Sequence, residues 1–319
     1  MLKKMDESRL QNRRGFIKRA MMGGGAIAAF SCLPDPVWAA IKEDYIKLTI
    51  LHTNDQHSRI DPFPPGDPQY PNRGGFARRA SLIKKIRSEE KNVLLFDAGD
   101  IWQGTPYFTI FGGELEFKLM SEMKYDGATI GNHDLDNGIE GFAKQLPLAA
   151  FPFINSNYDF SETALNGKTV PCKLFEKEGL KIGVFGLGIE LEGLVDKKNY
   201  GRIKYLNPVQ KAAEYAHLLK QENKCDMVIC LSHLGDKYAD NKVSDTVIAK
   251  QSKNIDLIIG GHTHRFLDKP ISLMNSDGKE VLVVQAGFGG IKLGRVDCVF
   301  HRRKQKKATS GTTLVISPD

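Results

Sequence analysis

The stretch Ala128-Thr129-Ile130-Gly131-Asn132-His133-Asp134-Leu135-Asp136 passes from a short apolar run into a dense group of polar side chains. We interpret the apolar run as the end of a buried strand and the polar residues as the loop that follows it. A carboxamide, an imidazole and two carboxylates this close together are too polar for a hydrophobic core. Because α/β proteins carry functional residues in loops at the carboxyl ends of strands, this stretch predicts an α/β fold with a functional site at one edge of a sheet.

Four other stretches share this layout, in which an apolar run ends in Asp, Asn, His or Gly. They are Leu48–His57, Val93–Asp100, Met227–His233 and Ile255–His264. Five predicted strand ends therefore bring acidic, amide and imidazole side chains to what we expect to be one rim of the protein.

Between these stretches the chain alternates patterns of helical and strand periodicity. We predict helices over 75–90, 113–125, 138–149, 207–222 and 243–252, and strands over 46–52, 93–96, 128–130, 151–154, 227–231, 255–259 and within 281–300. The turn at 176–179 predicts an antiparallel hairpin within 170–187. Two βαβ regions separated by a hairpin favour a single α/β domain, whose sheet can be divided into two packed layers.

The first 39 residues resemble a twin-arginine export signal, because Arg13-Arg14 precedes a moderately apolar stretch and Val37-x-Ala39 offers a cleavage site. The apolar stretch falls short of the roughly 20 residues that a membrane span needs. Removing these residues takes away seven Lys/Arg and three Asp/Glu, which lowers the formal charge by four, from +7 to +3. We therefore predict a domain over 40–319 that is exported to the periplasm, and we favour this reading over lipoprotein anchoring at Cys32.

The rest of the composition is that of an ordinary globular protein, with 26% charged and 41% hydrophobic residues in a chain of 319. The basic run at 301–307 has no interleaved aromatic residues, so we favour a solvated tail or edge strand over a nucleic-acid or anionic-lipid contact. Four cysteines follow the signal, and without a CxxC pair we expect small buried side chains, although the sequence leaves a disulfide open. They are Cys172, Cys225, Cys230 and Cys298.

Five of the eight histidines lie at predicted strand ends, which a structural role for each would not explain well. They are His57, His133, His233, His262 and His264. In an extended segment residues i and i+2 point to the same side, so Asp55-x-His57 and His262-x-His264 can each reach one site. Carboxylate, imidazole and amide ligands without thiolates favour Mn, Zn, Fe or Co over a structural zinc site. The number of candidate ligands exceeds what one ion with open positions needs, so we expect two divalent ions that share a carboxylate.

The order of these motifs resembles the calcineurin-like metallophosphoesterases. The motifs are Asp55-x-His57, Gly99-Asp100, Gly131-Asn132-His133-Asp134-x-Asp136, His233 and Gly261-His262-x-His264. The stretches 51–57 and 131–136 are similar to the bacterial 5′-nucleotidase branch of that family. The resemblance covers about residues 47–295 and implies a four-layer α/β/β/α sandwich of two mixed sheets flanked by helices.

The resemblance also implies a role for each motif residue. One metal ion would take Asp55, His57 and His264, the other would take Asn132, His233 and His262, and Asp100 would bridge them. A bridging hydroxide would then attack phosphorus in line. Asn132 and His133 would contact the substrate, with His133 as proton donor and Asp136 orienting its imidazole. From the sequence alone, Asp136 could instead cap the helix that follows Gly138.

Two departures from the family pattern limit what the resemblance implies. Asp134 and Leu135 stand where Glu and Phe are commoner, at positions that support the motif without binding. Exported 5′-nucleotidases of this branch also carry a second domain that stacks on the base and grips the phosphate, and we expect no such domain within these 319 residues. The resemblance therefore implies the metal centre but not the nucleotide specificity.

We predict an exported metal-dependent phosphatase that acts on small phosphorylated substrates, above all 5′-nucleotides, and not on nucleic-acid polymers. Three alternatives remain open. The chain could be the catalytic half of a split nucleotidase with a separate specificity-domain partner. It could be a thiosulfohydrolase of the same family, or a metal-bound binding protein without catalysis.

Overall fold

The computed structural model describes residues 45–240, 242–302 and 304–318, with only the backbone of 304–307. The predicted export signal at 1–39, the alternative anchor at Cys32 and the predicted domain start at residue 40 all lie outside this part of the chain. No helix within the described residues is long and apolar enough to cross a membrane.

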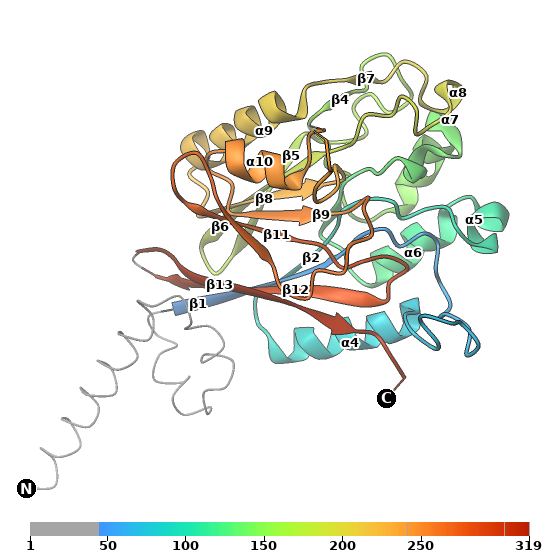
Figure 1. Cartoon of the computed structure of the whole chain (residues 1–319), viewed down its shortest axis with the longest axis horizontal. Coiled ribbons are helices and arrows are strands. Elements are labelled where there is room, and N and C mark those ends of the chain that lie inside the picture. The colour runs from blue at the N-terminus through green and yellow to red at the C-terminus, as the bar shows by residue number, and fades with distance from the viewer. Residues whose placement is uncertain (1–44, 241, 303, 319) are drawn as a thin grey trace, which may run out of the picture.

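Two mixed sheets form the centre of the protein (Figure 1). The first has the strand order β13-β12-β1-β2-β3 and the second β10-β11-β9-β8-β6-β5. The strands of the first sheet are β1 (Tyr45–Thr53), β2 (Val93–Asp97), β3 (Gly127–Ala128), β12 (Lys292–His301) and β13 (Lys304–Val315). Those of the second are β5 (Cys172–Lys177), β6 (Leu180–Leu187), β8 (Met227–Ser232), β9 (Leu257–Gly260), β10 (Ile271–Met274) and β11 (Glu280–Val284), and β4 (Tyr158–Asp159) pairs separately with β7 (Lys204–Tyr205).

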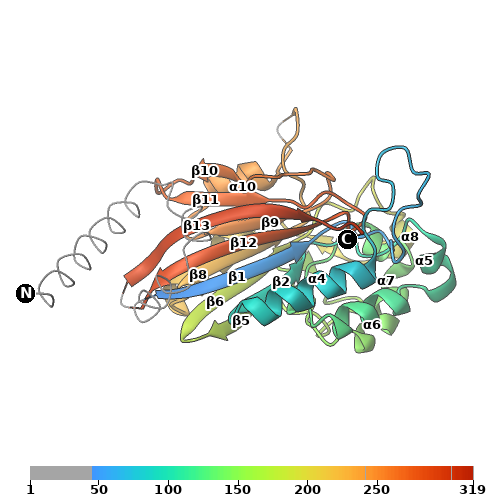
Figure 2. The same cartoon turned by 90° about the horizontal axis from the view of Figure 1, so that it is seen from below.

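Helices cover the outer face of each sheet, and Figure 2 shows α4 and α6 beneath β1 and β2. The helices are α4 (Phe76–Glu89), α5 (Pro106–Phe111), α6 (Glu114–Glu122), α7 (Gly138–Gln145), α8 (Lys197–Tyr200), α9 (Pro208–His217) and α10 (Asp245–Gln251). Short 3-10 turns span His133–Leu135 and Leu146–Leu148, and a π-helical turn spans Leu218–Glu222. The helices α4, α6 and α7 pack on the first sheet, whereas α9 and α10 pack on the second.

Three hydrophobic clusters separate the four layers. Every residue of β2 is buried, because Val93 and Leu95 face the helices while Leu94 and Phe96 face the second sheet. This alternation follows from the two-residue period of a strand that is covered on both faces. The predicted four-layer α/β/β/α sandwich is therefore confirmed.

The structure differs from the predicted elements in a few places. The segment 151–154 makes only isolated bridges at Phe153 and Ile154, since Pro152 cannot donate a ladder hydrogen bond. Pro147 ends α7 early and leaves a 3-10 turn after it. Helix α5 and strand β10 were not predicted, because both are too short to show a period.

The hairpin, the place of the basic run on an edge strand and the burial of three of the four cysteines agree with the predictions. Strands β5 and β6 pair antiparallel around a turn in which Glu178 and Gly179 have positive φ. The basic run enters β13, which is the edge strand of the first sheet. Cys225, Cys230 and Cys298 are buried, and Cys172 is partly exposed.

Candidate metal centre

The carboxyl ends of β1, β2, β3, β8 and β9 meet at one edge of the two sheets, on the right-hand side of Figure 1. Two groups of possible metal ligands lie there, and within each group the ligand atoms are no more than 4.8 Å apart. We name them the outer group (Asp55, His57 and His264) and the inner group (Asp100, His233 and His262).

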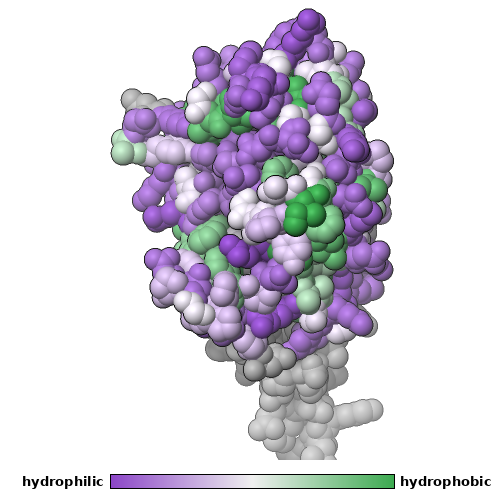
Figure 3. All heavy atoms as spheres, turned by 90° about the vertical axis from the view of Figure 1, so that its right-hand side faces the viewer, coloured by the Kyte–Doolittle hydropathy of each residue, from purple (hydrophilic) through white to green (hydrophobic). Residues whose placement is uncertain are grey.

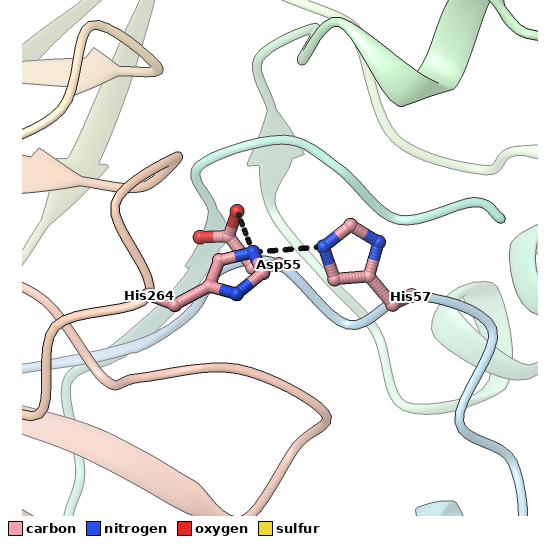
Figure 4. Close-up of side chains that lie close together, drawn as sticks. All are labelled: Asp55, His57 and His264. Carbon is pink, nitrogen blue, oxygen red and sulfur yellow. Dashed lines mark hydrogen bonds and ion pairs between the residues drawn. The ribbon is translucent and has the colours of Figure 1, made fainter. Parts of the chain in front are cut away.

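The outer group is open to solvent on one side. Figure 4 shows its three side chains pointing toward one another from the loop after β1 and the loop after β9. His264 Nε2 lies 3.3 Å from Asp55 Oδ1 and 2.9 Å from His57 Nε2. The His264 side chain is 41% exposed, whereas that of Asp55 is buried.

The inner group is closed off from solvent. The His233 side chain has no exposed surface, and its Nδ1 donates a 2.7 Å hydrogen bond to the Ala98 carbonyl. This bond turns Nε2 toward Asp100, whose Oδ2 lies 3.1 Å away. His233 Nε2 nevertheless has no hydrogen-bond partner among the described residues. Asn132 borders the same group, since its side-chain oxygen lies 2.9 Å from His262 Nδ1.

The two groups are direct neighbours. The backbone amide of His262 lies 3.0 Å from both carboxylate oxygens of Asp55 and donates to them. The Asp55 amide in turn donates to the Gly99 carbonyl, next to Asp100. The His57 amide donates to the Asp100 carbonyl, so Asp100 of the inner group lies next to the outer group.

Glycines allow this close approach. A Cβ on Gly131 would lie 2.2 Å from Asp100 Oδ1, and a Cβ on Gly261 would lie 2.8 Å from His233 Nδ1. Real Cβ atoms do not approach other atoms this closely, so the glycines of two motifs are required by the packing of ligand side chains.

Five of these residues have a left-handed backbone. Their φ values are 48° for Asp55, 50° for His57, 56° for Asp100, 70° for His262 and 54° for His264. The expectation of extended Asp-x-His and His-x-His segments is therefore wrong. His262 and His264 lie two residues apart but belong to different groups, because the backbone turns at both. Such conformations are strained for residues other than glycine and cluster at functional sites.

Burial and the neighbouring charges both shift the pKa values of the side chains in the inner group. Burial lowers the pKa of His233, but the carboxylates of Asp100 and Asp55 outweigh it and raise the pKa to about 10. Burial and the nearby His233 lower the pKa of His262 to about 4. Burial also opposes ionisation of Asp100, yet the surrounding imidazoles hold its pKa below its ordinary value. Binding of a cation would therefore release a proton from this cluster.

His133 lies beside the ligand groups and is not a member of either. Its ring lies 5.4 Å from that of His57, and its Nδ1 lies 2.7 Å from Asp136 Oδ2. The hydrogen bond to Asp136 raises the pKa of His133 against the effect of burial. Asn137, and not Asp136, precedes α7, and no side-chain hydrogen bond caps that helix. The geometry therefore pairs Asp136 with the imidazole.

Asp134 has a structural role that the sequence did not reveal. Its buried carboxylate accepts four backbone hydrogen bonds, from Gly131 at 2.8 Å and from Asp100, Ile101 and Trp102 at 3.0, 2.9 and 3.2 Å. It thereby joins the loop after β3 to the loop after β2. The only signal in the sequence was an acidic side chain in a loop that begins with glycine.

The donor set fits divalent cations. The groups offer carboxylate oxygens and imidazole nitrogens without thiolates, a mixture that borderline divalent metals accept. His57 Nδ1 lies 3.3 Å from the Trp102 carbonyl, so in both groups a carbonyl orients one imidazole with Nε2 toward the other ligands. Such outer hydrogen bonds are typical of metal-binding histidines. The buried Nε2 of His233, which lies 3.1 Å from Asp100 Oδ2 but makes no hydrogen bond to a described residue, is likewise suited to a metal ion.

Comparison with known proteins agrees with this geometry. The chain is 31% identical to a snake venom 5′-nucleotidase of Crotalus adamanteus and 33% identical to a 5′-nucleotidase of Vibrio cholerae, over 86% and 79% of its length. It spans about half the length of these relatives, 48% and 46%. A 5′-nucleotidase precursor from Thermus thermophilus has a similar structure, with a TM-score of 0.76, 30% identity and coverage of 86% of this chain and 55% of that one. The model of the calcineurin-like phosphoesterases, a family that uses divalent metals, matches residues 48–266, and the chain therefore belongs to this family.

Proposed function

We propose that the protein is a dimetal phosphoesterase that hydrolyses phosphate monoesters, with 5′-nucleotides as its substrates. The observation that carries the proposal is the adjacency of the outer and inner groups, which the His262 amide joins through Asp55. The names of its relatives support nucleotides as the substrate class.

In this proposal each group holds one divalent ion. Asp55, His57 and His264 would hold the outer ion, His233 and His262 would hold the inner ion together with Asn132, and Asp100 would be the carboxylate that serves both. When bound, the ions supply positive charge for the phosphoryl oxygens and a water acidic enough to attack phosphorus near neutral pH.

His133 is the proposed proton donor. Asp136 holds Nδ1 of its imidazole, which leaves Nε2 to donate to the leaving-group oxygen or to a phosphoryl oxygen. The hydrogen bond to Asp136 raises the pKa of His133, which favours the protonated imidazole that a proton donor requires. Asn132 precedes His133 in the chain and carries a side-chain amide that can donate to the same substrate while its oxygen faces the inner group.

A substrate panel tests the proposal. Manganese-loaded protein should release phosphate from adenosine 5′-monophosphate, ribose 5-phosphate and an aryl phosphate, and should leave a thiosulfate ester intact. Hydrolysis of the thiosulfate ester alone would instead show the thiosulfohydrolase alternative. Metal-loaded protein that binds nucleotides but hydrolyses none of the four compounds would leave only the non-catalytic binding role.

A second candidate adds a separately encoded specificity domain as partner. One observation favours it: α5 leaves the large apolar side chain of Ile110 71% exposed. Gly104, just before α5, packs on the backbone of His57. Protein isolated from its own cells should then have a lower KM than the recombinant chain, and Ile110→Asp should abolish the difference. Equal KM values for the two preparations would contradict this candidate.

Export by the twin-arginine route is part of the proposal. It would carry a folded protein with its ions in place, which suits a site built from distant parts of the chain. Replacing Arg13 and Arg14 by Lys should leave the protein inside the cell. Unchanged periplasmic activity of that variant would contradict export by this route.

A further inference from the structure

Four aromatic rings form a cluster beside the outer group, which we name the aromatic cluster. Its members are Phe63, Tyr70, Phe266 and Phe288. They come from the loop after β1, the loop after β9 and the loop before β12. Tyr70 contacts the other three rings, with centroid distances of 5.7, 5.8 and 5.6 Å to Phe63, Phe266 and Phe288.

The aromatic cluster begins at a proposed metal ligand. The Phe288 ring lies parallel to the His264 imidazole, with a centroid distance of 5.2 Å and an interplanar angle of 17°. The loop that carries Phe288 is fixed to the end of β1, because the Gly289 amide donates to the Asp55 carbonyl at 2.7 Å. Asn54 also donates to the Gly287 carbonyl at 2.6 Å. The position of Phe288 is therefore set by Asp55 of the outer group and by its neighbour Asn54.

The loop that carries Tyr70 is held in shape by its own contacts. The Asp67 carboxylate accepts the backbone amides of Gln69 and Tyr70 at 2.9 and 2.6 Å. Across the base of the loop, the Phe63 amide donates to the Arg73 carbonyl at 2.8 Å. Prolines occupy four of the positions between these two residues, which limits the backbone further. Tyr70 is thus presented on a pre-ordered loop.

Phe63 and Phe266 each lie against a cationic side chain. The Arg59 guanidinium lies 4.4 Å from the Phe63 ring centre, and the Lys292 ammonium lies 5.2 Å from that of Phe266. Their other neighbours include Gly289 and Gly287, where an added Cβ would lie 2.9 and 2.1 Å from the respective rings.

Tyr70 differs from these two rings. Tyr70 and Phe266 are both partly exposed, but among the described residues no cation lies over the Tyr70 ring and no parallel ring lies against it. Its hydroxyl likewise makes no hydrogen bond to any described residue. A ring packed only to complete a core would be buried, and a buried hydroxyl would need a partner.

We propose that Tyr70, supported by Phe266 and Phe288, is the surface on which the base of a nucleotide stacks while its phosphoryl group lies at the outer and inner groups. This inference rests on the proposed function and assigns the base subsite to this domain. Two successive ring contacts, with centroid distances of 5.2 and 5.6 Å, lead from His264 through Phe288 to Tyr70, so the aromatic cluster extends outward from the outer group. Stacking on an aromatic side chain is tolerant of base identity, so the subsite would accept purine and pyrimidine nucleotides alike.

Substrates with and without a base test the inference. In the manganese-loaded protein, Tyr70→Ala should lower kcat/KM for adenosine 5′-monophosphate by about 5- to 150-fold, mainly through KM, which is the range expected for loss of one base stack. Hydrolysis of ribose 5-phosphate should be unchanged, and Tyr70→Phe should retain the wild-type preference for the nucleotide. An equal loss for both esters would show that Tyr70 only holds the loop, and no loss for either would show that the base does not touch it.

Phe111→Ala is the matched control, because Phe111 is an exposed aromatic side chain on α5 outside the aromatic cluster. It should leave both substrates unaffected. A selective loss of nucleotide hydrolysis in this variant, with none in Tyr70→Ala, would place the base on α5 and overturn the inference.

A binding measurement separates the inference from the proposed function. Saturation-transfer NMR with metal-free protein should show contact to the base protons of adenosine, and Tyr70→Ala should reduce that signal while Phe111→Ala does not. An unchanged signal in Tyr70→Ala would overturn the stacking inference even if the protein hydrolyses nucleotides. Wild-type protein that shows this contact but hydrolyses neither ester would instead overturn the proposed hydrolysis.

Discussion

The outer and inner groups contain the same kinds of side chain but lie in different surroundings. In the inner group, His233 is fully buried and is held by a 2.7 Å hydrogen bond to the Ala98 carbonyl. In the outer group, His264 is 41% exposed, and the corresponding bond from His57 to the Trp102 carbonyl is 3.3 Å long. The difference indicates that burial and orientation, and not ligand chemistry, distinguish the two positions. We expect the inner ion to be retained and the outer ion to exchange with solvent.

Removing one imidazole from each group should have the largest effect. His233→Ala should lower kcat/KM by at least about 10³-fold, because loss of an ion removes several kcal/mol of stabilisation from the transition state. His264→Ala should show a similar loss at limiting manganese but should recover most activity at excess manganese. Metal analysis beside the assay would detect the missing ion. Equal recovery of both variants would contradict the distinction between the groups.

A variant outside both groups should separate metal binding from chemistry. His133→Ala should lower kcat by about 10² to 10⁴-fold, the usual contribution of a positioned proton donor. Its metal content should remain that of the wild type, since His133 belongs to neither group. A loss of metal in this variant would show that His133 acts as a ligand.

Replacing Asp136, the hydrogen-bond partner of His133, should lower activity less than replacing His133 itself. Asp136→Asn keeps the shape of the side chain but removes the charge that raises the pKa of His133. We expect kcat to fall by about 10- to 100-fold, as for other residues that orient a functional histidine. The KM should change little. If the loss were equal in KM and kcat, a role of Asp136 in substrate binding would be indicated instead.

Removing the two ions one after the other should have the smallest effect of these changes. It tests directly whether the outer ion exchanges more readily than the inner ion. Dialysis against a weak chelator should remove one ion first, with loss of activity and little change in thermal stability. Removal of the second ion should lower the free energy of unfolding by about 2.7 kcal/mol if that ion was present at 100 times its Kd. Calorimetry with metal analysis would measure both steps. Loss of both ions in one step would contradict the expected difference in exchange.

Much of the fold follows from local signals in the sequence. Apolar runs such as Met227–Ser232 and Leu257–Gly260 are strands buried on both faces, and each ends where the run breaks into polar residues. The four-layer sandwich came from the resemblance to a family, because periodicity alone does not tell one sheet from two. Short elements such as α5 and β10 gave no period to recognise.

The sequence predicted which side chains gather at the site better than how they are arranged. Asp55, His57, His262 and His264 were expected in extended segments, whereas all four have positive φ. Arguments from the i, i+2 spacing fail there, because tertiary contacts impose a left-handed backbone that is uncommon outside glycine and that the sequence alone does not reveal. Asp134 was underrated for a similar reason, since its four amide partners come mainly from a loop more than thirty residues away.

The four hydrogen bonds of Asp134 have a consequence for how the protein acquires its ions. Two of the loops that contribute ligands are already fastened together by protein atoms, so cations need not organise them. Small zinc domains differ in this respect, since their chains fold only around the ion. We therefore expect the folded apoprotein to take up metal rapidly, at a rate that is first order in protein and first order in metal. No slow conformational phase should follow.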